Sequence, residues 1–572
     1  MKNDIRFQMI LSSSIIICIV ILFWVYILIT SYGVQSEEAV VENSERRTYL
    51  ESTNFILSGP NSEYPFPTQH TLPVLSIKME PDDLWSEETG IYVRGLYKNY
   101  NQHGIEWERP AEIFYYDKDG NLGFKVGAGV RIYGGATRST AQKSLRIITR
   151  RDYGERSIVY PIFDDHPYYV FDQIVLRNAG NDWRSTMLRD PISQKVYESV
   201  LDTQAYSPCV VYLNDEYWGI HNIREVYDER YFHERYAADK NDVVIIEPDR
   251  DDNGYPEINV GKEGDEISYV EMVDYIEKND MATDQNLEYV STLMDLENYC
   301  DYIIVGSYLD KTDWFGKNFA IWRNRTDEYV PDAAYGLDGR WRWLQYDMDS
   351  GFAAKRTLSV PEDHDTLKKW FHTDLKYGPW TTSIFLNLIK NESFKNDLLN
   401  RYADLINTTF QSENVLPIID EYENAIRDEI PGHIDRWKGE LDKSHKPPFQ
   451  SLDEWESNVQ MLREFAAKRP DYDRANVVKD FDLAGTCEIA LNLSPYGSGQ
   501  VRINSALYSE ENQSPVYFQE IPVAIEAIPA DGQIFVGWDG DSELLESDSR
   551  ETKLICESDA IELTAIFSEK DK

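Results

Sequence analysis

The 572-residue sequence has few cysteines and few basic residues for its length. Its five cysteines form no CxxC pair, and its nine histidines show no HExxH spacing, so no zinc site of the usual kinds is expected. The 57 basic residues are outnumbered by 100 acidic ones, which leaves a net charge of -43. Because such a charge repels a phosphate backbone, the protein is not expected to bind nucleic acid.

Two common phosphate-binding motifs are also absent. The chain contains neither a GxGxxG motif nor a Walker sequence, so no glycine-rich phosphate loop is predicted. Hydrophobic residues nonetheless make up 42% of the chain and aromatic residues 13%, which argues against global disorder. Because 572 residues exceed what one hydrophobic core usually serves, we expect two or three folded units.

One apolar segment near the N-terminus is long enough to cross a bilayer. Residues 7–36 contain no charge, and Lys2 and Arg6 precede them while four glutamates follow. The positive-inside rule therefore predicts a single-pass protein of the cell membrane, with a cytoplasmic N-terminus and an extracellular bulk. A cleaved signal peptide is the alternative. The length of the apolar run favours an uncleaved anchor in residues 1–36, followed by a polar stalk in residues 37–70.

The rest of the chain changes pattern several times. Residues 71–129 show short alternating runs typical of β-strands. Residues 130–482 combine strands, a hairpin and helices, and the pattern from 380 to 470 is helical. Residues 483–572 return to a β pattern and are predicted to form a separate small all-β domain. The predicted fold class is α+β.

The strongest group of polar residues follows a predicted helix over residues 296–309. Asp313 and Asn318 lie in the next loop, and two predicted strands then lead to Asp347. Because paired strands return the chain to the same end, we expect these three side chains to lie together. Phosphoryl transfer needs a carboxylate to receive or orient the acceptor hydroxyl, and an Asn and an Asp to hold Mg²⁺. Turn formation and capping are the alternative for an Asp and an Asn at this spacing.

Two further residues complete the candidate site. Asp349 follows Asp347 at the end of a strand predicted to be buried, where acids need a partner, either a metal or an arginine. Lys143 begins a strand after a Gly-Gly turn, where a lysine can neutralise nucleotide phosphates. A solvated lysine on an edge strand is the alternative. Without a glycine-rich loop, phosphate contacts would come from Lys143, from nearby arginines such as Arg138, and from the metal.

A series of short segments carries a combination of residues that is specific although each piece is not. The segments, in chain order, are residues 134–138, 142–147, 176–178, 188–190, 211–219, 313–318 and 343–352. Together they resemble the CotH family of atypical, kinase-like spore-coat proteins, and the likeness extends over about residues 72–440. The resemblance implies a divergent, two-lobed kinase-like fold that uses ATP and Mg²⁺ or Mn²⁺. It also implies phosphorylation of Ser or Thr in a secreted, surface or coat protein, or in the chain itself.

The resemblance also implies roles for single residues. Lys143 would be the nucleotide lysine and Asp313 the catalytic-loop acid. Asn318 and Asp347 would be metal ligands, with Asp349 as a further ligand.

Two questions stay open at the level of the sequence. Glu225, at the end of a predicted hairpin, either lies near the nucleotide at a hinge or pairs with a lysine. The alternative to an active kinase is an inactive kinase-like scaffold that serves in cell-surface adhesion or coat structure.

The C-terminal region has a resemblance of its own. Residues 524–529, 535–540 and 563–567, which include a Phe-x-Gly-Trp signature, resemble the InlB-type β-repeat of bacterial surface proteins. This likeness implies a binding or spacer module and names no ligand. Cys487 and Cys556 permit a disulfide in an oxidising exterior, and two buried free thiols are the alternative.

Overall fold

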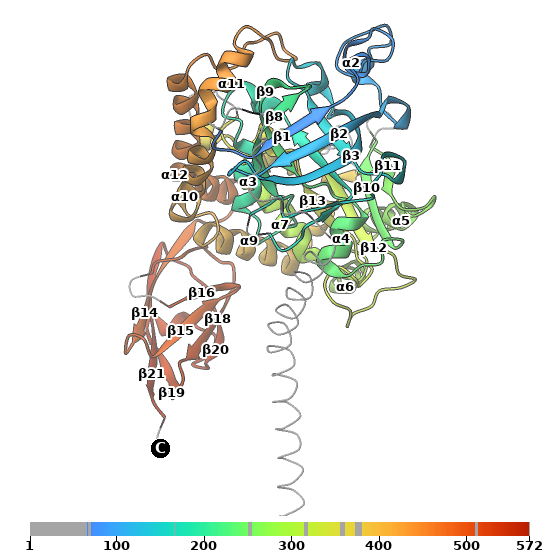
Figure 1. The fold of residues 1–572 in the computed structure, drawn as a ribbon. Coiled ribbons are helices and arrows are strands. Elements are labelled where there is room, and N and C mark those ends of the chain that lie inside the picture. The colour runs from blue at the N-terminus through green and yellow to red at the C-terminus, as the bar shows by residue number, and fades with distance from the viewer. Residues whose placement is uncertain are drawn as a thin grey trace, which may run out of the picture. The chain divides into compact units, whose positions relative to one another are not determined.

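The computed structural model describes residue 66 and residues 70–570, except for residues 165, 250–253, 314–317, 355–360, 372–379 and 510–512. This part of the chain is mixed α+β, as predicted (Figure 1). The predicted membrane segment, residues 7–36, lies outside the described residues, as does nearly all of the predicted stalk. Within the described residues, no helix is both long and apolar enough to span a bilayer.

Seven strands near the N-terminus close into a barrel (Figure 1). β1 pairs with β8 in parallel, which closes the ring. Around the barrel the strands are β1 (Val74–Lys78), β2 (Arg109–Tyr116), β3 (Leu122–Tyr133), β4 (Ser144–Ile148), β7 (Gln173–Arg177), β9 (Glu216–Arg224) and β8 (Tyr206–Leu213). Short elements in the connections are α2 (Pro81–Trp85) and the paired strands β5 (Ile158–Val159) and β6 (Val170–Phe171).

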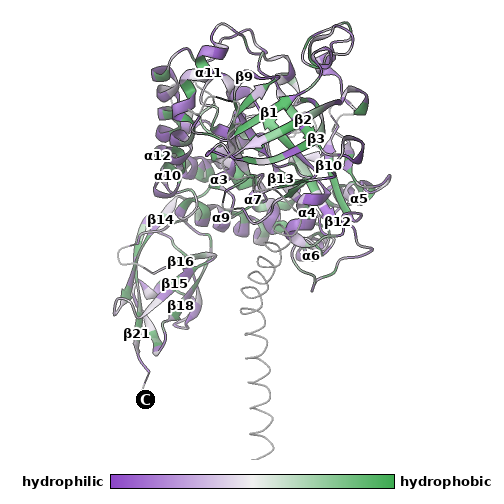
Figure 2. Cartoon of the chain, in the orientation of Figure 1, coloured by the Kyte–Doolittle hydropathy of each residue, from purple (hydrophilic) through white to green (hydrophobic). Residues whose placement is uncertain are grey.

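Side chains alternate between the interior and the exterior of the barrel. Val130 and Ile132 of β3 and Leu145 and Ile147 of β4 belong to one buried apolar cluster. β1 is coloured largely as hydrophobic residues in Figure 2. The predicted domain boundary at residue 129 falls inside β3, so the β-rich segment before it is part of the barrel and not a unit apart.

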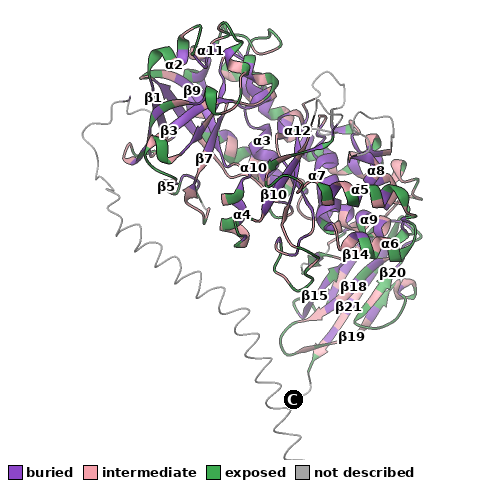
Figure 3. Ribbon diagram, turned by 90° about the vertical axis from the view of Figure 1, so that its right-hand side faces the viewer, coloured by how far each residue is buried: buried purple, intermediate pink, exposed green. Residues whose placement is uncertain are grey.

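A second sheet has the strand order β11-β10-β12-β13, and its bounds are β10 (Val243–Pro248), β11 (Pro256–Val260), β12 (Phe319–Asn324) and β13 (Arg342–Gln345). The predicted pair β12 and β13 is confirmed, whereas the sequence pattern did not predict β10 or β11. Helix α7 (Leu296–Tyr308) is also as predicted, and Figure 3 shows it mainly as buried. It contacts β13 through Asn298, whose Oδ1 accepts a hydrogen bond from the Trp343 amide at 2.6 Å.

The predicted helical pattern over residues 380–470 is confirmed, with α12 extending to Asp480. The side chain of Ser451 caps α12 by accepting a hydrogen bond from the amide of Glu454 at 3.1 Å. The helices are α3 (Arg189–Val196), α4 (Glu229–Tyr236), α5 (Ile267–Lys278), α6 (Asp284–Ser291), α8 (Thr382–Leu388), α9 (Glu392–Asn407), α10 (Ser412–Ile426), α11 (Ile430–Trp437) and α12 (Leu452–Asp480).

The C-terminal region consists of two four-stranded sheets, which confirms its predicted β character. The region contacts α9, where the Asp404 carboxylate accepts hydrogen bonds from the Ser505 amide and the Tyr517 hydroxyl, both at 2.8 Å. Cys487 and Cys556 are buried free thiols, and Cys487 Sγ donates to the Glu488 carbonyl at 3.9 Å. The strands are β14 (Thr486–Ser494), β15 (Gly499–Ile503), β16 (Ala506–Tyr508), β17 (Val516–Phe518), β18 (Val523–Pro529), β19 (Gln533–Gly540), β20 (Glu551–Leu554) and β21 (Ala560–Glu569).

Candidate active site

A cleft of about 670 Å³ is lined by β3, β4 and β7 of the barrel and by β10, β11 and the ends of β12 and β13. The structure brings four of the predicted site residues to this cleft: Asp313, Asn318, Asp347 and Asp349. Arg138 also lines it. The antiparallel pairing of Phe319 with Gln345 explains the convergence, because it returns the chain from β13 to the loop that precedes β12.

The loop between α7 and β12 carries the first two of these residues. Asn318 Nδ2 donates a hydrogen bond to Asp313 Oδ2 at 2.9 Å. Ser350 Oγ, from the turn after β13, donates to the other carboxylate oxygen of Asp313. The Asp313 carboxylate is therefore oriented both by its own loop and by the turn that carries the other two acids.

Asp347 and Asp349 share one cation, Arg177, at the end of β7. Arg177 Nη2 donates to Asp349 Oδ2 at 2.9 Å and to Asp347 Oδ1. The backbone amide and the side-chain amide of Asn181 each donate to Asp349 at 2.7 Å. Burial raises the pKa of Asp349, and the neighbouring charge of Asp347 raises it further. Burial alone would also raise the pKa of Asp347, but Arg177 outweighs it and the pKa is lowered.

Lys311 is fully buried between the two acidic segments of the site, which are the loop of Asp313 and Asn318 and the turn of Asp347 and Asp349. Its Nζ donates to the Asn318 carbonyl at 2.7 Å, to Gln345 Oε1 at 3.0 Å and to the Tyr346 carbonyl at 2.6 Å. These bonds tie the loop of Asn318 to the end of β13. Burial lowers the pKa of Lys311 to about 8. Lys311 was not among the predicted site residues, although its place between the end of α7 and Asp313 was a usable signal.

The backbone at the site is held in unusual conformations. Asp310, Asn318 and Asp347 have φ angles of 52°, 58° and 57°, in the left-handed region that Asn and Asp tolerate better than other residues. Gly180 has a φ of 62°, and a Cβ atom there would lie 1.9 Å from Asp349 Oδ2. The close approach of Asp349 to the backbone therefore requires glycine at this position.

Lys143, the predicted nucleotide lysine, does not line the cleft. Its side chain is only 4% exposed, and Nζ donates to the carbonyls of Arg138 and Thr140 at 2.8 and 2.9 Å. The ammonium also lies over the rings of Tyr92 and Tyr100, at 5.2 and 4.4 Å from their centroids. The physical reason is strand alternation, since Lys143 precedes β4 in phase with the residues that face the barrel interior.

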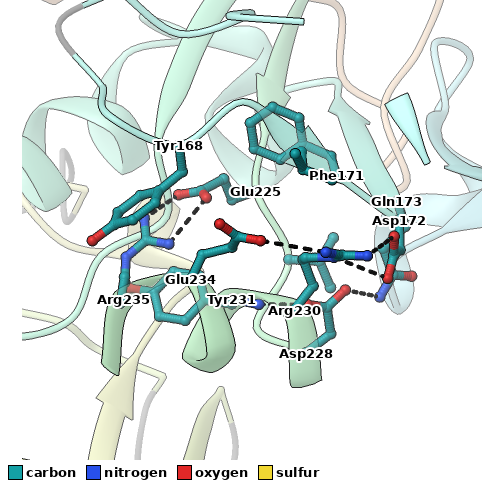
Figure 4. A pocket seen from close by; sticks show the side chains of 12 residues that line it. Tyr168, Phe171, Asp172, Gln173, Glu225, Asp228, Arg230, Tyr231, Glu234 and Arg235 are labelled. Atoms are coloured by element: carbon teal, nitrogen blue, oxygen red, sulfur yellow. Dashed lines mark hydrogen bonds and ion pairs between the residues drawn. The ribbon is translucent and has the colours of Figure 1, made fainter. Parts of the chain in front are cut away.

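The other two predicted nucleotide contacts have protein partners. Arg138 donates to the carbonyls of Tyr100 and Gln102, both at 3.0 Å. Glu225 lies in a different pocket, where Arg235 Nη2 donates to its Oε2 at 2.7 Å (Figure 4). Burial would raise the pKa of Glu225, but Arg235 outweighs it and lowers the pKa to about 2. The structure therefore pairs Glu225 with an arginine and does not place it at the cleft.

The donor chemistry of the cleft suits a hard divalent cation. Asp347, Asp349 and Asn318 offer carboxylate and amide oxygens, the ligands that Mg²⁺ prefers. In the part of the chain that the structure describes, no three acidic, His or Cys side chains lie close enough together to hold a metal. A metal here would therefore depend on Asn318 and on a bound ligand as well as the acids, and it would share or replace the bonds of Arg177.

The sequence matches the CotH kinase protein family over residues 130–472, which is more than half of the chain. The chain belongs to the CotH kinase family. The predicted resemblance is thereby confirmed. No curated protein matches the sequence. All the cleft residues named above fall within the CotH match, whereas β1 and β2, which complete the barrel, lie before it.

Proposed function

We propose that this CotH-family protein transfers the terminal phosphate of ATP to a serine or threonine hydroxyl of a protein acceptor, or of itself, with Mg²⁺ or Mn²⁺. The observation that carries the proposal is the convergence of Asp313, Asn318, Asp347 and Asp349 on one cleft within the CotH match. In this proposal the barrel and the helical region are the two lobes of a divergent kinase-like fold.

The residues of the cleft divide the work between them. Asp313 receives the proton of the acceptor hydroxyl or orients that hydroxyl, and Asn318 and Ser350 hold its carboxylate in place. Asp347 and Asn318 hold the metal, and Asp349 is a further ligand. The bound metal supplies positive charge that stabilises the phosphates during transfer. Lys311 keeps the acidic loop and the end of β13 in register.

The setting of the reaction is part of the proposal. Residues 7–36 anchor the chain in the cell membrane, and the cleft faces the exterior, where the acceptor is a secreted, surface or coat protein. The apolar run and the flanking charges support this orientation. Protease added to intact cells should then degrade the C-terminal region, and full protection of that region would overturn the orientation.

Two nearly isosteric substitutions separate the proposed roles. Asp347→Asn should weaken metal-dependent nucleotide binding as well as phosphate transfer, because a neutral amide does not supply the negative charge that a carboxylate brings to a hard cation. Asp313→Asn should leave nucleotide affinity nearly unchanged while transfer slows by about 10²-fold or more, the scale of a lost acid-base group. The measurements are nucleotide titration calorimetry and transfer of labelled phosphate from ATP to the chain itself or to secreted proteins.

Asp471→Asn provides the matched control, since that side chain is 92% exposed and lies outside the cleft. It should behave as the wild type in both assays. If Asp313→Asn abolished nucleotide binding while Asp347→Asn left it intact, the assigned roles would be wrong. A wild-type chain that binds no nucleotide with either metal would favour the inactive scaffold.

A further inference from the structure

The basic side chains that line the cleft differ in what they bind. Arg177 bonds two carboxylates, and Lys443 Nζ donates to Asn181 Oδ1 at 2.5 Å. Arg138 donates to backbone carbonyls. The two remaining guanidinium groups, those of Arg131 and Arg146, form no ion pair with any described residue.

Arg131 and Arg146 lie directly opposite each other on the neighbouring strands β3 and β4. Arg146 Nε donates to a neutral acceptor, Gln173 Oε1, at 2.7 Å, and Arg146 Nη2 donates to the same oxygen, so only Nη1 has no protein partner among the described residues. The guanidinium group of Arg131 makes no hydrogen bond to the part of the chain that the structure describes, and the acid near it, Glu108, is already paired with Arg150 at 2.9 Å. Like charges directly opposite on adjacent strands destabilise a sheet, so such a pair is expected where an anion binds between them.

Both guanidinium groups are partly buried and face the cleft. They lie out of phase with the interior residues Val130 and Ile147, so strand alternation directs them away from the barrel core. The proposed metal ligands line the same cleft but come from the loop before β12 and the turn after β13. A ligand with several negative charges could therefore meet both these arginines and a carboxylate-bound cation in the same cleft.

We propose that Arg131 and Arg146 together bind the phosphate groups of a nucleoside di- or triphosphate. The inference rests on the proposed function, because it takes the cleft to be the nucleotide site. A guanidinium group fits phosphate with two parallel hydrogen bonds, which a lysine cannot form. The chain has no glycine-rich phosphate loop, and Lys143, at the start of β4, does not line the cleft. The arginine pair would supply the phosphate contacts in their place.

Titration calorimetry on the full-length chain tests the pair with three probes: MgADP, sodium tripolyphosphate and adenosine. Arg131→Gln and Arg146→Gln should each weaken MgADP and tripolyphosphate binding by about tenfold or more, the scale of a lost charge-assisted hydrogen bond. Adenosine affinity should stay the same, because adenosine carries no phosphate. Arg151→Gln removes the same charge from an exposed position outside the cleft and should change nothing.

The outcomes separate this inference from the proposed function. If the wild-type chain binds MgADP and both glutamine variants bind it equally well, the arginine pair is refuted while the nucleotide site stands. If Lys143→Met loses tripolyphosphate binding and the arginine variants keep it, the lysine is the phosphate contact and the inference is wrong. A wild-type chain that binds neither MgADP nor tripolyphosphate overturns both. Thermal melts of each variant check that a lost affinity is not a folding defect.

Discussion

Gly180→Ala places a methyl group where the structure has no room for one. The new Cβ would lie 1.9 Å from Asp349 Oδ2 and 2.8 Å from Arg177 Nη2. Since real Cβ atoms do not approach other atoms so closely, the Asp349 carboxylate must move. Gly497 is the matched control, because it also has a positive φ, 77° against 62°, and a Cβ there meets nothing within 4 Å.

The magnitude follows from the bonds that Asp349 would lose. Both alanines must adopt a left-handed backbone conformation, which costs about 1–2 kcal/mol. At Gly180 the displaced carboxylate also gives up its bonds to Asn181 at 2.7 Å and to Arg177 at 2.9 Å. Breaking such a buried, charged network typically lowers the free energy of unfolding by about 3–5 kcal/mol. Metal-dependent nucleotide affinity should fall by about tenfold or more, because the new methyl group displaces both Asp349 and Arg177, which orients the Asp349 carboxylate.

Urea unfolding and nucleotide titration measure the two effects separately. We expect Gly497→Ala to lose about 1–2 kcal/mol of unfolding free energy and to bind nucleotide normally. Gly180→Ala should lose clearly more stability and also bind nucleotide weakly. If the two variants had equal stability and equal affinity, the position of Asp349 against the Gly180 backbone, and its place at the metal, would be refuted.

Three further predictions concern other parts of the molecule. Lys311→Met leaves three buried acceptors without their donor, so melting temperature and metal-dependent nucleotide affinity should both fall; an unchanged melting curve would contradict the tie between the two acidic segments. Deletion of residues 483–572 should lower the melting temperature, because Asp404 loses its partners, yet MgADP should still bind at low temperature, since every cleft residue lies upstream. Burial lowers the pKa of His433 to about 3 in the folded state, against about 6.5 in the unfolded chain. Below pH 6.5 the unfolded chain therefore binds a proton that the folded chain does not, and the free energy of unfolding decreases as the pH is lowered, by about 2 kcal/mol at pH 5. His433→Asn should flatten that fall by the same amount in urea titrations at pH 7 and pH 5, whereas parallel curves would contradict it.

The spacing of apolar residues in the sequence predicted the helices and strands whose formation depends on neighbouring residues. The helical spacing of apolar residues located α7, and alternation located β12 and β13. Strands β10 and β11 were not predicted, because they lie in an acidic stretch and β10 is fixed by pairing with β12, some 80 residues away.

The residues of the candidate site also fall into those that local sequence could predict and those that it could not. Asp313, Asn318 and Asp347 could be placed together, because a strand pair connects them and its geometry is local. Arg177 could not, since its bonds to Asp347 and Asp349 join residues about 170 positions apart. Only the tertiary fold, which brings the turn after β13 against the end of β7, puts these groups in contact.

Lys143 shows how a shift of one residue along a strand decides whether a side chain lies in the barrel interior or at the cleft. Because side chains alternate along a strand, a lysine and an arginine three positions apart project to opposite faces. Leu145 and Ile147 of β4 are apolar and lie in the barrel interior, so the phase of the strand was already present in the sequence. That phase assigns Lys143 to the interior side and Arg146 to the cleft, as the structure has them. A position after a glycine turn suggested Lys143 as the phosphate contact, whereas the strand phase makes Arg146 the residue of the two that lines the cleft.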